Sequence, residues 1–435
     1  MKTSILLSVA IIAILLISFF LFKIIERKRR ININVGVLYT TEGGSMAPYE
    51  KELYNRVMHS IKSFNKIQDK YHINTFEHNP QSETDKYTKG MEMLINKHDP
   101  AIIIGVWRSV DRKAVIPVLE KTDNLLCYAV QYEGNECSRN ILYFGATPNQ
   151  QTNIAIEYAI KNISNNVILI GSDYVFPRTA NTIMKDYIKK YNANLIMEKY
   201  VALDEENFSS VCDEILKNNK KCVIINTING DSNKHFFTTL NKKFKSIKQN
   251  NNAIRSSQFP IISLSIPESI ISDYNIDDIY GDYHIWNYSQ KDTSFNTFLS
   301  DRLIHNNPKL NKLIKNFKDS KKVIGDPEYH SFLITLFFFS FLLSYEGPNY
   351  DSITLRNEFL KYKEKVITPT GYLQLNDNNH LDNFVYILKI GLDKRYETIY
   401  RTPVEINPNP WYNVSNNIKF ECNNLYSFMG SKYKI

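Results

Sequence analysis

Short runs of β-branched and aliphatic residues recur along this chain, and they constrain its fold more than any other feature of the sequence. The runs lie at 33–39, 101–106, 125–130, 166–171, 221–227 and 260–265. A strand that is apolar on both faces must be covered on both faces, which is the situation of a strand in a parallel sheet packed between helices. We therefore expect these runs to be buried strands of parallel sheets.

Segments with helical spacing of apolar residues follow most of these strands. The spacing predicts helices at 48–71, at 111–120, at 178–191 and in the segment after Asp231. Alternation of strands and helices is typical of an α/β protein. The number of strand–helix units exceeds what one ordinary sheet holds, so we expect the 435 residues to form two α/β lobes.

The first thirty residues differ from the rest of the chain. Residues 3–22 are uncharged and mostly apolar, and about 20 helical residues span a hydrocarbon core of about 30 Å. A basic flank follows at 23–30 without a small-residue cleavage site, which favours an uncleaved single-pass membrane anchor over a signal peptide. The positive-inside rule favours a cytoplasmic body, but the side stays open. A second apolar run, 331–345, is too short to span and predicts a buried helix.

Charge, cysteines and motifs argue against several classes of function. Residues 1–30 carry +5 of the formal net charge of +8, so a body of +3 has little attraction for nucleic acid. The five cysteines are widely spaced and odd in number, unlike a disulfide framework or a zinc site. Metalloprotease, nucleophile-elbow and P-loop motifs do not occur in the sequence. We expect no enzyme activity, no metal and no cofactor.

Polar and aromatic residues gather in the loops that follow four of the expected strands. These loops carry Trp107-Arg108-Ser109, Gln131-Tyr132-Glu133-Gly134, Ser172-Asp173-Tyr174 and Asn229-Gly230-Asp231-Ser232-Asn233. Ligands of open α/β sheets bind at the carboxyl ends of the strands, where such loops meet. The loops are therefore the first candidates for a binding site.

At these loops the sequence resembles the urea- and short-chain-amide-binding branch of the type I periplasmic binding proteins, the substrate-binding subunits of ABC importers. The resemblance runs in order through most of the chain and ends at Pro410-Trp411. The matching segments are VGVLYTTEGGSMA (35–47), GVWRSVDRKAVIPVLEK (105–121), YAVQYEGNECSRNILYFGATPNQQ (128–151), GSDYVFPRTAN (171–181), NTINGDSN (226–233), GDYHIWNYSQ (281–290) and GYLQLNDNNHLDNFVYI (371–387).

The resemblance implies a type I periplasmic-binding-protein fold, with two doubly wound parallel-sheet lobes joined by a three-crossing hinge. The division it implies is 31–147 with about 284–345 for the first lobe, and 148–283 with about 346–411 for the second. Residues 412–435 are then a C-terminal extension. The lobes are expected to close over a small planar amide, with a transporter permease as a possible partner.

The loop chemistry agrees with such a ligand. Urea presents four N–H bonds and one carbonyl on a flat frame, so its receptor needs acceptors, a donor and flat faces. The resemblance implies that hydroxyls, a carboxylate and aromatic rings of these loops contact the ligand. The candidate ligand-binding residues are Trp107, Ser109, Tyr128, Tyr174, Asp231, Trp286 and Tyr288.

Departures from the family pattern leave the ligand open. Arg108 replaces a small or apolar residue, and its guanidinium is expected to clash with a neutral amide, to favour an anionic ligand, or to point out to solvent. Ala129 replaces the usual proline of that loop. Besides a solute receptor, two alternatives stay open: a regulatory amide sensor of the same fold, and a scaffold without ligand that acts in protein–protein interaction.

Overall fold

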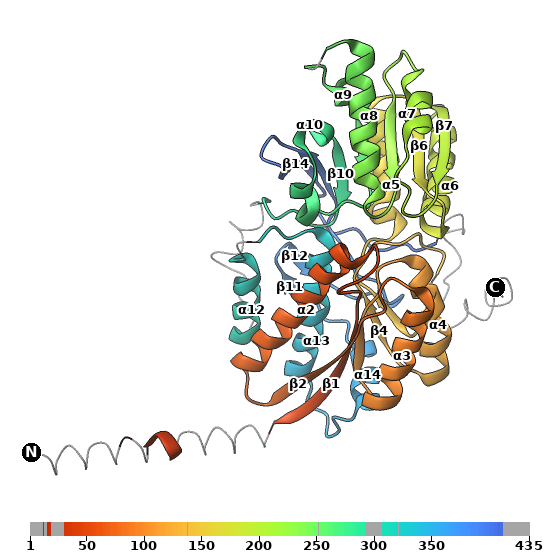
Figure 1. The fold of residues 1–435 in the computed structure, drawn as a ribbon. Coiled ribbons are helices and arrows are strands. Elements are labelled where there is room, and N and C mark those ends of the chain that lie inside the picture. Colours follow the sequence, from red (N-terminus) through yellow and green to blue (C-terminus); the bar gives the residue numbers. More distant parts are fainter. Residues whose placement is uncertain are drawn as a thin grey trace, which may run out of the picture.

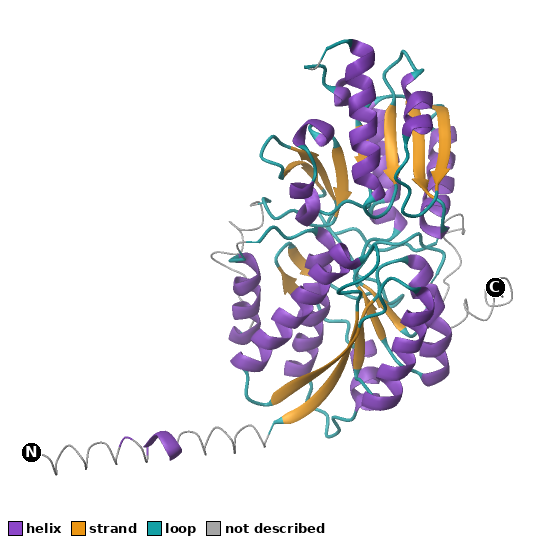
Figure 2. Ribbon diagram, in the orientation of Figure 1, coloured by secondary structure: helices purple, strands orange, loops and turns teal. Residues whose placement is uncertain are grey.

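The computed structural model describes residues 12, 15–18, 30–136, 138–250, 252–292, 307–320 and 322–411. In this part of the chain two α/β lobes lie one above the other, each with helices packed on its own sheet (Figure 1). Strands fill the interior of both lobes and helices lie outside them (Figure 2). The two-lobed α/β architecture predicted from the sequence is therefore confirmed.

The first lobe is built on a five-stranded sheet with the order β2-β1-β3-β4-β5, in which every pair is parallel. The strands are β1 Ile31–Leu38, β2 Tyr71–His78, β3 Ile102–Gly105, β4 Leu126–Tyr128 and β5 Ile141–Tyr143. Its helices are α2 Ala47–Ile67, α3 Thr84–His98, α4 Ser109–Thr122, α12 Pro308–Lys318, α13 Asp326–Ser344 and α14 Ser352–Lys361, with a hairpin of β11 Val366–Thr368 and β12 Gly371–Leu373.

The second lobe is built on a seven-stranded sheet with the order β14-β13-β10-β9-β8-β6-β7. The strands are β6 Asn166–Ser172, β7 Asn194–Val201, β8 Val223–Thr227, β9 Ile261–Ser263, β10 Tyr283–Trp286, β13 Tyr386–Ile390 and β14 Tyr396–Arg401. The helical elements are η1 Pro148–Gln150, α5 Thr152–Tyr158, η2 Ala159–Ile163, α6 Val175–Lys190, α7 Ser209–Leu216, α8 Ser232–Lys248, α9 Arg255–Gln258, η3 Glu268–Asp273 and α10 Ile276–Ile279.

The second sheet is not wholly parallel, which corrects the prediction of two parallel sheets. β13 pairs antiparallel with β10, and β14 pairs antiparallel with β13. β14 is an edge strand with mostly exposed side chains, so it lacks the continuous apolar run that marks a strand covered on both faces. For the same reason β2, with its alternating polar residues, was not predicted as a strand.

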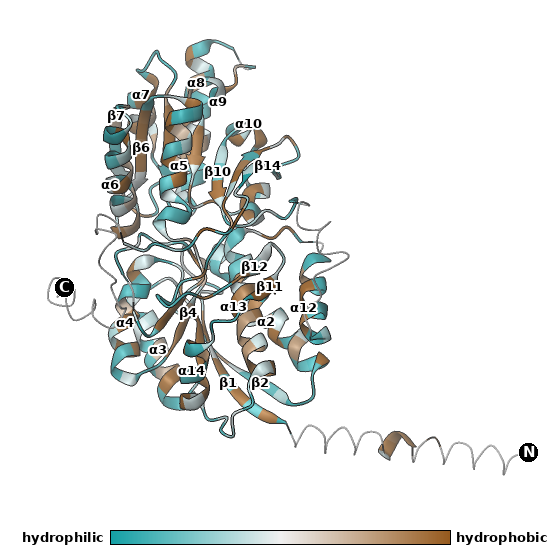
Figure 3. Ribbon diagram, turned by 180° about the vertical axis from the view of Figure 1, so that it is seen from behind, coloured by the Kyte–Doolittle hydropathy of each residue, from teal (hydrophilic) through white to brown (hydrophobic). Residues whose placement is uncertain are grey.

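The helix α13 confirms the prediction of a buried apolar helix at 331–345. Nearly all of its residues are buried, and it packs along α2 in the first lobe. The ring of Phe339 stacks on that of Phe64, with 3.9 Å between centroids. A view from behind shows brown, apolar strands in both lobes and many teal, polar residues on the outer helices (Figure 3).

The chain passes between the two sheets three times: between β5 and β6, after β10, and before β13. Asn287 joins these crossings, because its Nδ2 donates to the carbonyl oxygens of Gln150 at 3.2 Å and Phe384 at 2.9 Å. Asn383 Nδ2 likewise donates to the Phe144 carbonyl at 3.2 Å. Buried amide side chains thus connect all three crossings.

The division between the lobes differs from the predicted one at two places. Strand β10 pairs with β9 and β13, so 284–286 belong to the second sheet rather than to the first lobe. The helix α14 lies on the first lobe instead of the second, since Arg356 donates to the carbonyl oxygens of Asp123 and Pro100. Neither place shows a change of composition that a sequence reading can detect.

The predicted membrane localisation is contradicted. Within the described residues, no helix combines the length and the apolar character that a membrane crossing requires. The stretch 3–22, on which the prediction depended, lies almost wholly outside the described residues, as does the predicted extension 412–435.

Candidate functional site

The carboxyl ends of the two sheets face each other, so the loops predicted to bind a ligand meet between the lobes. Gln131, after β4, donates from Nε2 to the carbonyl oxygen of Leu264, after β9, at 2.9 Å. The helices α4 and α6, which follow β3 and β6, are also in contact. The candidate site is therefore the interface between the lobes.

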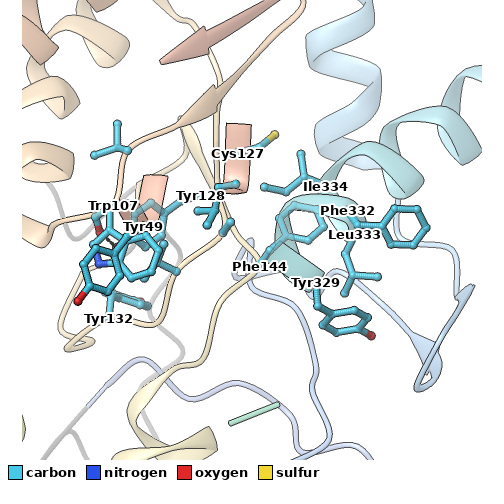
Figure 4. Close-up of a cluster of buried hydrophobic side chains, with 14 of the residues drawn as sticks. Tyr49, Trp107, Cys127, Tyr128, Tyr132, Phe144, Tyr329, Phe332, Leu333 and Ile334 are labelled. Atoms are coloured by element: carbon cyan, nitrogen blue, oxygen red, sulfur yellow. Dashed lines mark hydrogen bonds between the residues drawn. The ribbon is translucent and has the colours of Figure 1, made fainter. Parts of the chain in front are cut away.

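Trp107 forms part of the first-lobe wall together with Tyr49. The two rings meet edge to face with 5.5 Å between centroids, and both side chains are buried. Figure 4 shows these rings beside Tyr128 and Tyr132. Val106, just before Trp107, has φ 69°, a left-handed conformation that is strained for a β-branched residue. Such strain concentrates at functional sites, where the surrounding packing maintains it.

Ser109 begins α4 and is held by buried charges. Its hydroxyl donates to Glu133 Oε2 at 2.5 Å and accepts from Arg112 at 3.3 Å. Arg112 is fully buried and also pairs with Glu136, at 2.8 Å. Despite burial, Arg112 and Lys113 hold the pKa of Glu136 well below its usual range. Ser109 is therefore part of an ionic network, and Glu133 does more than shape a turn.

Tyr128 supports the wall from behind. Its hydroxyl donates to the carbonyl oxygen of Trp107 at 2.6 Å, and the side chain is fully buried. The guanidinium of Arg112 lies between the rings of Tyr128 and Tyr132, at 4.8 and 4.7 Å from their centroids. Tyr128 thus positions Trp107, and the hydroxyl proton of Tyr128 is already engaged in this hydrogen bond.

Tyr174 forms the facing wall of the second lobe. It precedes α6, and its hydroxyl accepts a hydrogen bond from Asn229 Nδ2. Burial raises the pKa of this hydroxyl, and Tyr128 and Glu133 of the first lobe raise it further. Because those two groups belong to the other lobe, Tyr174 lies where the lobes meet.

Asp231 lies at the rim of the same wall. It precedes α8, is 49% exposed, and pairs with Lys234 at 3.3 Å. The neighbouring Gly230 has φ 68°, and a Cβ built there would have no atom within 4 Å. The glycine therefore leaves open space beside the interface.

Tyr49 and Tyr274 complete the interface, although the sequence analysis did not identify them. Burial raises the pKa of Tyr49, and Asp231 and Asp273 of the second lobe raise it further. Burial likewise raises the pKa of Tyr274, with Tyr49 as the next cause. Tyr49 is the third residue of a helix and Tyr274 lies beyond a strand-following loop, so no local motif marked either one.

Six buried polar atoms of this region have no hydrogen-bond partner outside this group within the described part of the chain, and the hydroxyls of Tyr49 and Tyr274 are near enough to pair with each other. Each belongs to a residue that follows a strand at the facing edges of the sheets. Four are hydroxyls and two are amide oxygens: those of Tyr49, Tyr274, Ser232 and Ser265, and those of Gln131 and Asn229. The amide nitrogens of Gln131 and Asn229 are already bound, so their oxygens are left as acceptors.

Arg108 is held by contacts within the first lobe. Its Nε donates to Asp111 at 2.6 Å, and one terminal nitrogen donates to the Ser82 carbonyl at 2.6 Å and to Asp111 at 3.0 Å. Asp111 therefore neutralises Arg108, as two glutamates neutralise Arg112. The expectation that Arg108 favours an anion gains no support from this geometry.

Tyr288 lies apart from the tyrosines and loops described above, whereas Trp286 reaches the loop after β9 that carries Ser265. Trp286 ends β10 and donates from Nε1 to the Ile266 carbonyl at 3.0 Å. Tyr288 stacks on Tyr329 with 4.4 Å between centroids, next to a crossing between the lobes. Both are buried, and the structure brings together Trp107, Ser109, Tyr128, Tyr174 and Asp231, with Trp286 behind the loop after β9 and Tyr288 away from the group.

Comparison with known proteins agrees with this architecture. The model of the family described as "Periplasmic binding protein domain" matches residues 33–417, so the chain belongs to this family. Its members are solute-binding proteins and not enzymes, which confirms the prediction that the chain is not an enzyme.

Solved structures show the same fold at low identity. A solute-binding protein of an ABC transporter from R. palustris, in complex with 4-hydroxybenzoate, has a TM-score of 0.66 at 14% identity and covers 86% of this chain and 97% of its own. An amino acid ABC transporter substrate-binding protein from Pseudomonas fluorescens Pf-5 has a TM-score of 0.68 at 14% identity, and it covers 87% of this chain and 97% of its own. The branched-chain amino acid transporter substrate-binding protein of Streptococcus pneumoniae, in complex with isoleucine, has a TM-score of 0.65 at 11% identity. It covers 86% of this chain and 100% of its own.

Proposed function

We propose that this protein is a solute receptor whose lobes close over a small neutral amide such as urea, for delivery to a transporter permease. The observation that carries the proposal is the set of six buried polar atoms between the lobes that form no hydrogen bond with the described protein outside this set. Two are amide oxygens, which only accept, and four are hydroxyls, which both accept and donate. Such a set matches a molecule with several N–H bonds and one carbonyl.

The charges of the interface favour a neutral ligand over a carboxylate. Arg108 and Arg112, the guanidinium groups nearest to this region, are each paired with carboxylates. The similar receptors from R. palustris and S. pneumoniae were solved with 4-hydroxybenzoate and isoleucine, both of which carry a carboxylate. Burial of an anion requires an available cation or several donors, and the amide oxygens of Gln131 and Asn229 would repel it.

Thermal unfolding of the full chain with urea, formamide or acetamide tests the proposal, with 4-hydroxybenzoate and isoleucine as comparison ligands. A ligand present at about 100 times its Kd stabilises the folded state by about 2.7 kcal/mol. We expect such a shift with an amide. A shift with a carboxylate alone contradicts the proposed ligand class, and no shift with any compound favours the alternative of a scaffold without ligand.

Hydroxyl-deleting variants locate the binding event. Loss of one hydrogen-bond partner costs about 1–3 kcal/mol, so Tyr49→Phe and Tyr274→Phe should weaken amide binding about tenfold or more. The control is Tyr71→Phe, because this tyrosine is also buried but lies at the amino end of β2 beside Lys70 and Tyr350, away from the facing loops. Equal weakening in all three variants would contradict a site between the lobes.

A further inference from the structure

A groove of about 820 Å³ opens on the outer flank of the first lobe, between α2 and the strands β1 and β2. Arg30 and Asn32 line it at the amino end of β1, whereas the interlobe loop begins at Thr40, beyond the other end of that strand. Its lining shares no residue with the interlobe site. The groove is therefore a separate feature of the molecule.

The lining is basic and includes no acidic residue. His59, Lys62 and Lys66 lie on one face of α2 at spacings of three and four residues, and Arg30 and His72 come from the strand side. Burial lowers the pKa of His59, and the charges of Arg56, Lys62 and Lys66 lower it further. The same charges that disfavour a proton on His59 favour an anion in the groove.

Arg30 gives the groove a fixed donor. One terminal nitrogen donates to the Asn65 carbonyl at 3.0 Å, and the other meets Asp69 at 3.5 Å, a residue whose side chain is 67% exposed. Its Nε is buried and has no hydrogen-bond partner within the described residues. A guanidinium held in this way is suited to an oxyanion, because its donors form a rigid planar fork.

We propose that this groove is a second binding site, for a phosphate-bearing molecule. Its volume is in the range of small-molecule sites, about 300–1,000 Å³. A solvated helix face explains exposed lysines on α2, but it does not explain why polar strand residues and a half-buried arginine face them across a hollow. The shared chemistry is an oxyanion, carried by a free phosphate compound or by a lipid headgroup.

Calorimetric titration of the full chain with inorganic pyrophosphate tests the site, together with flotation on vesicles of phosphatidylglycerol and of phosphatidylcholine. We expect binding of pyrophosphate, of phosphatidylglycerol vesicles, or of both, and none to phosphatidylcholine. Which probe binds identifies the source of the oxyanion. Failure of both anionic probes overturns the proposal.

Charge-matched variants separate a built site from general attraction. Lys62→Ala with Lys66→Ala should weaken binding about tenfold or more, because two cations face the anion at short range. Lys89→Ala with Lys97→Ala is the control, since these exposed lysines of α3 change the net charge equally but do not line the groove. Equal weakening by both pairs overturns the proposal. Tyr274→Phe should leave pyrophosphate binding unchanged, which keeps this test independent of the proposed amide site.

Discussion

At the scale of single residues, Arg112 determines the shape of the first-lobe wall. Its guanidinium lies between two tyrosine rings and pairs with Glu133 and Glu136. A buried cation is tolerated only when its charge and its donors are satisfied, and here two carboxylates and Ser109 satisfy them. The position of Ser109 therefore depends on a residue that does not reach a ligand.

Replacement of Arg112 should be strongly destabilising. In Arg112→Leu, two buried glutamates keep only Lys113 as a cationic partner, and breaking such a network costs about 3–5 kcal/mol. Urea denaturation measures the loss. The control Arg139→Leu removes an exposed arginine that pairs with Asp123 at 3.4 Å, and it should cost about 1 kcal/mol or less. Similar losses for the two variants would contradict a structural role of the buried network.

Glu50 predicts a pH dependence of stability. Burial raises the pKa of this carboxyl from 4.5 to about 8, although hydrogen bonds from Tyr87 and Thr40 oppose the shift. The folded state holds this proton more tightly than the unfolded state. The stabilisation that Glu50 gives the folded state is therefore complete below pH 4.5 and is lost as the pH rises through 8.

Glu50→Gln should remove this loss, because an amide cannot ionise. The unfolding free energy of the variant relative to wild type should therefore rise between pH 4.5 and 8, as followed by urea denaturation at several pH values. The exposed Glu92→Gln on α3 serves as control and should leave the pH profile unchanged. A stability difference that does not change with pH would contradict this prediction, because it would mean that Glu50 has the same pKa in the folded and unfolded states.

At the scale of elements, the pairing of α13 with α2 holds the first lobe together. α13 has almost no polar face and is covered on all sides, whereas α2 presents apolar residues to it and basic residues outward. The same helix α2 therefore contributes to the core with one side and to the basic groove with the other.

Truncation at this contact should create a cavity. Phe339→Ala removes the ring stacked on Phe64, and large-to-small changes of this kind cost about 3–5 kcal/mol. Ile353→Ala on α14, where the side chain is 59% exposed, should change stability by less than about 0.5 kcal/mol. Thermal unfolding compares the two variants, and a small effect of Phe339→Ala would mean that the contact is loosely packed.

At the scale of the whole molecule, the hinge couples the lobes through buried polar groups. Asn287 donates from its backbone to Asp326 at 2.7 Å and from its side chain to two other crossings. Asp326 in turn contacts His330 at 2.9 Å. Burial lowers the pKa of His330, but the Asp326 carboxylate outweighs this effect and holds that pKa above its usual value.

Asn287→Ala should weaken this coupling. The carbonyl oxygens of Gln150 and Phe384 lose a buried donor, which costs about 1–3 kcal/mol of stability. Because the lobes are then less firmly oriented, we expect small-angle scattering to show a larger radius of gyration. Asn162→Ala is the control, since this exposed amide also donates to a carbonyl oxygen, at 3.2 Å. An unchanged stability and radius would contradict a hinge role for Asn287.

Much of the fold could be predicted from the sequence because burial on both faces leaves a local signature. The runs at 33–39, 101–106, 166–171, 221–227 and 260–265 all contain strands of the two sheets. β2 and β14 were not predicted, because strands with polar or exposed positions do not form continuous apolar runs. The membrane localisation was wrong, since a hydropathy pattern alone does not establish a spanning helix.

The sequence by itself determined the alternation of strands and helices, the two lobes, and the polar loops at the carboxyl ends of the strands. Only the tertiary structure decided which loop residues keep unsatisfied polar atoms, as with Gln131 and Asn229, and which are already paired, as with Ser109 and Arg108. The physical reason is that strand and helix signals arise from local periodicity, whereas hydrogen-bond satisfaction depends on partners far apart in the chain.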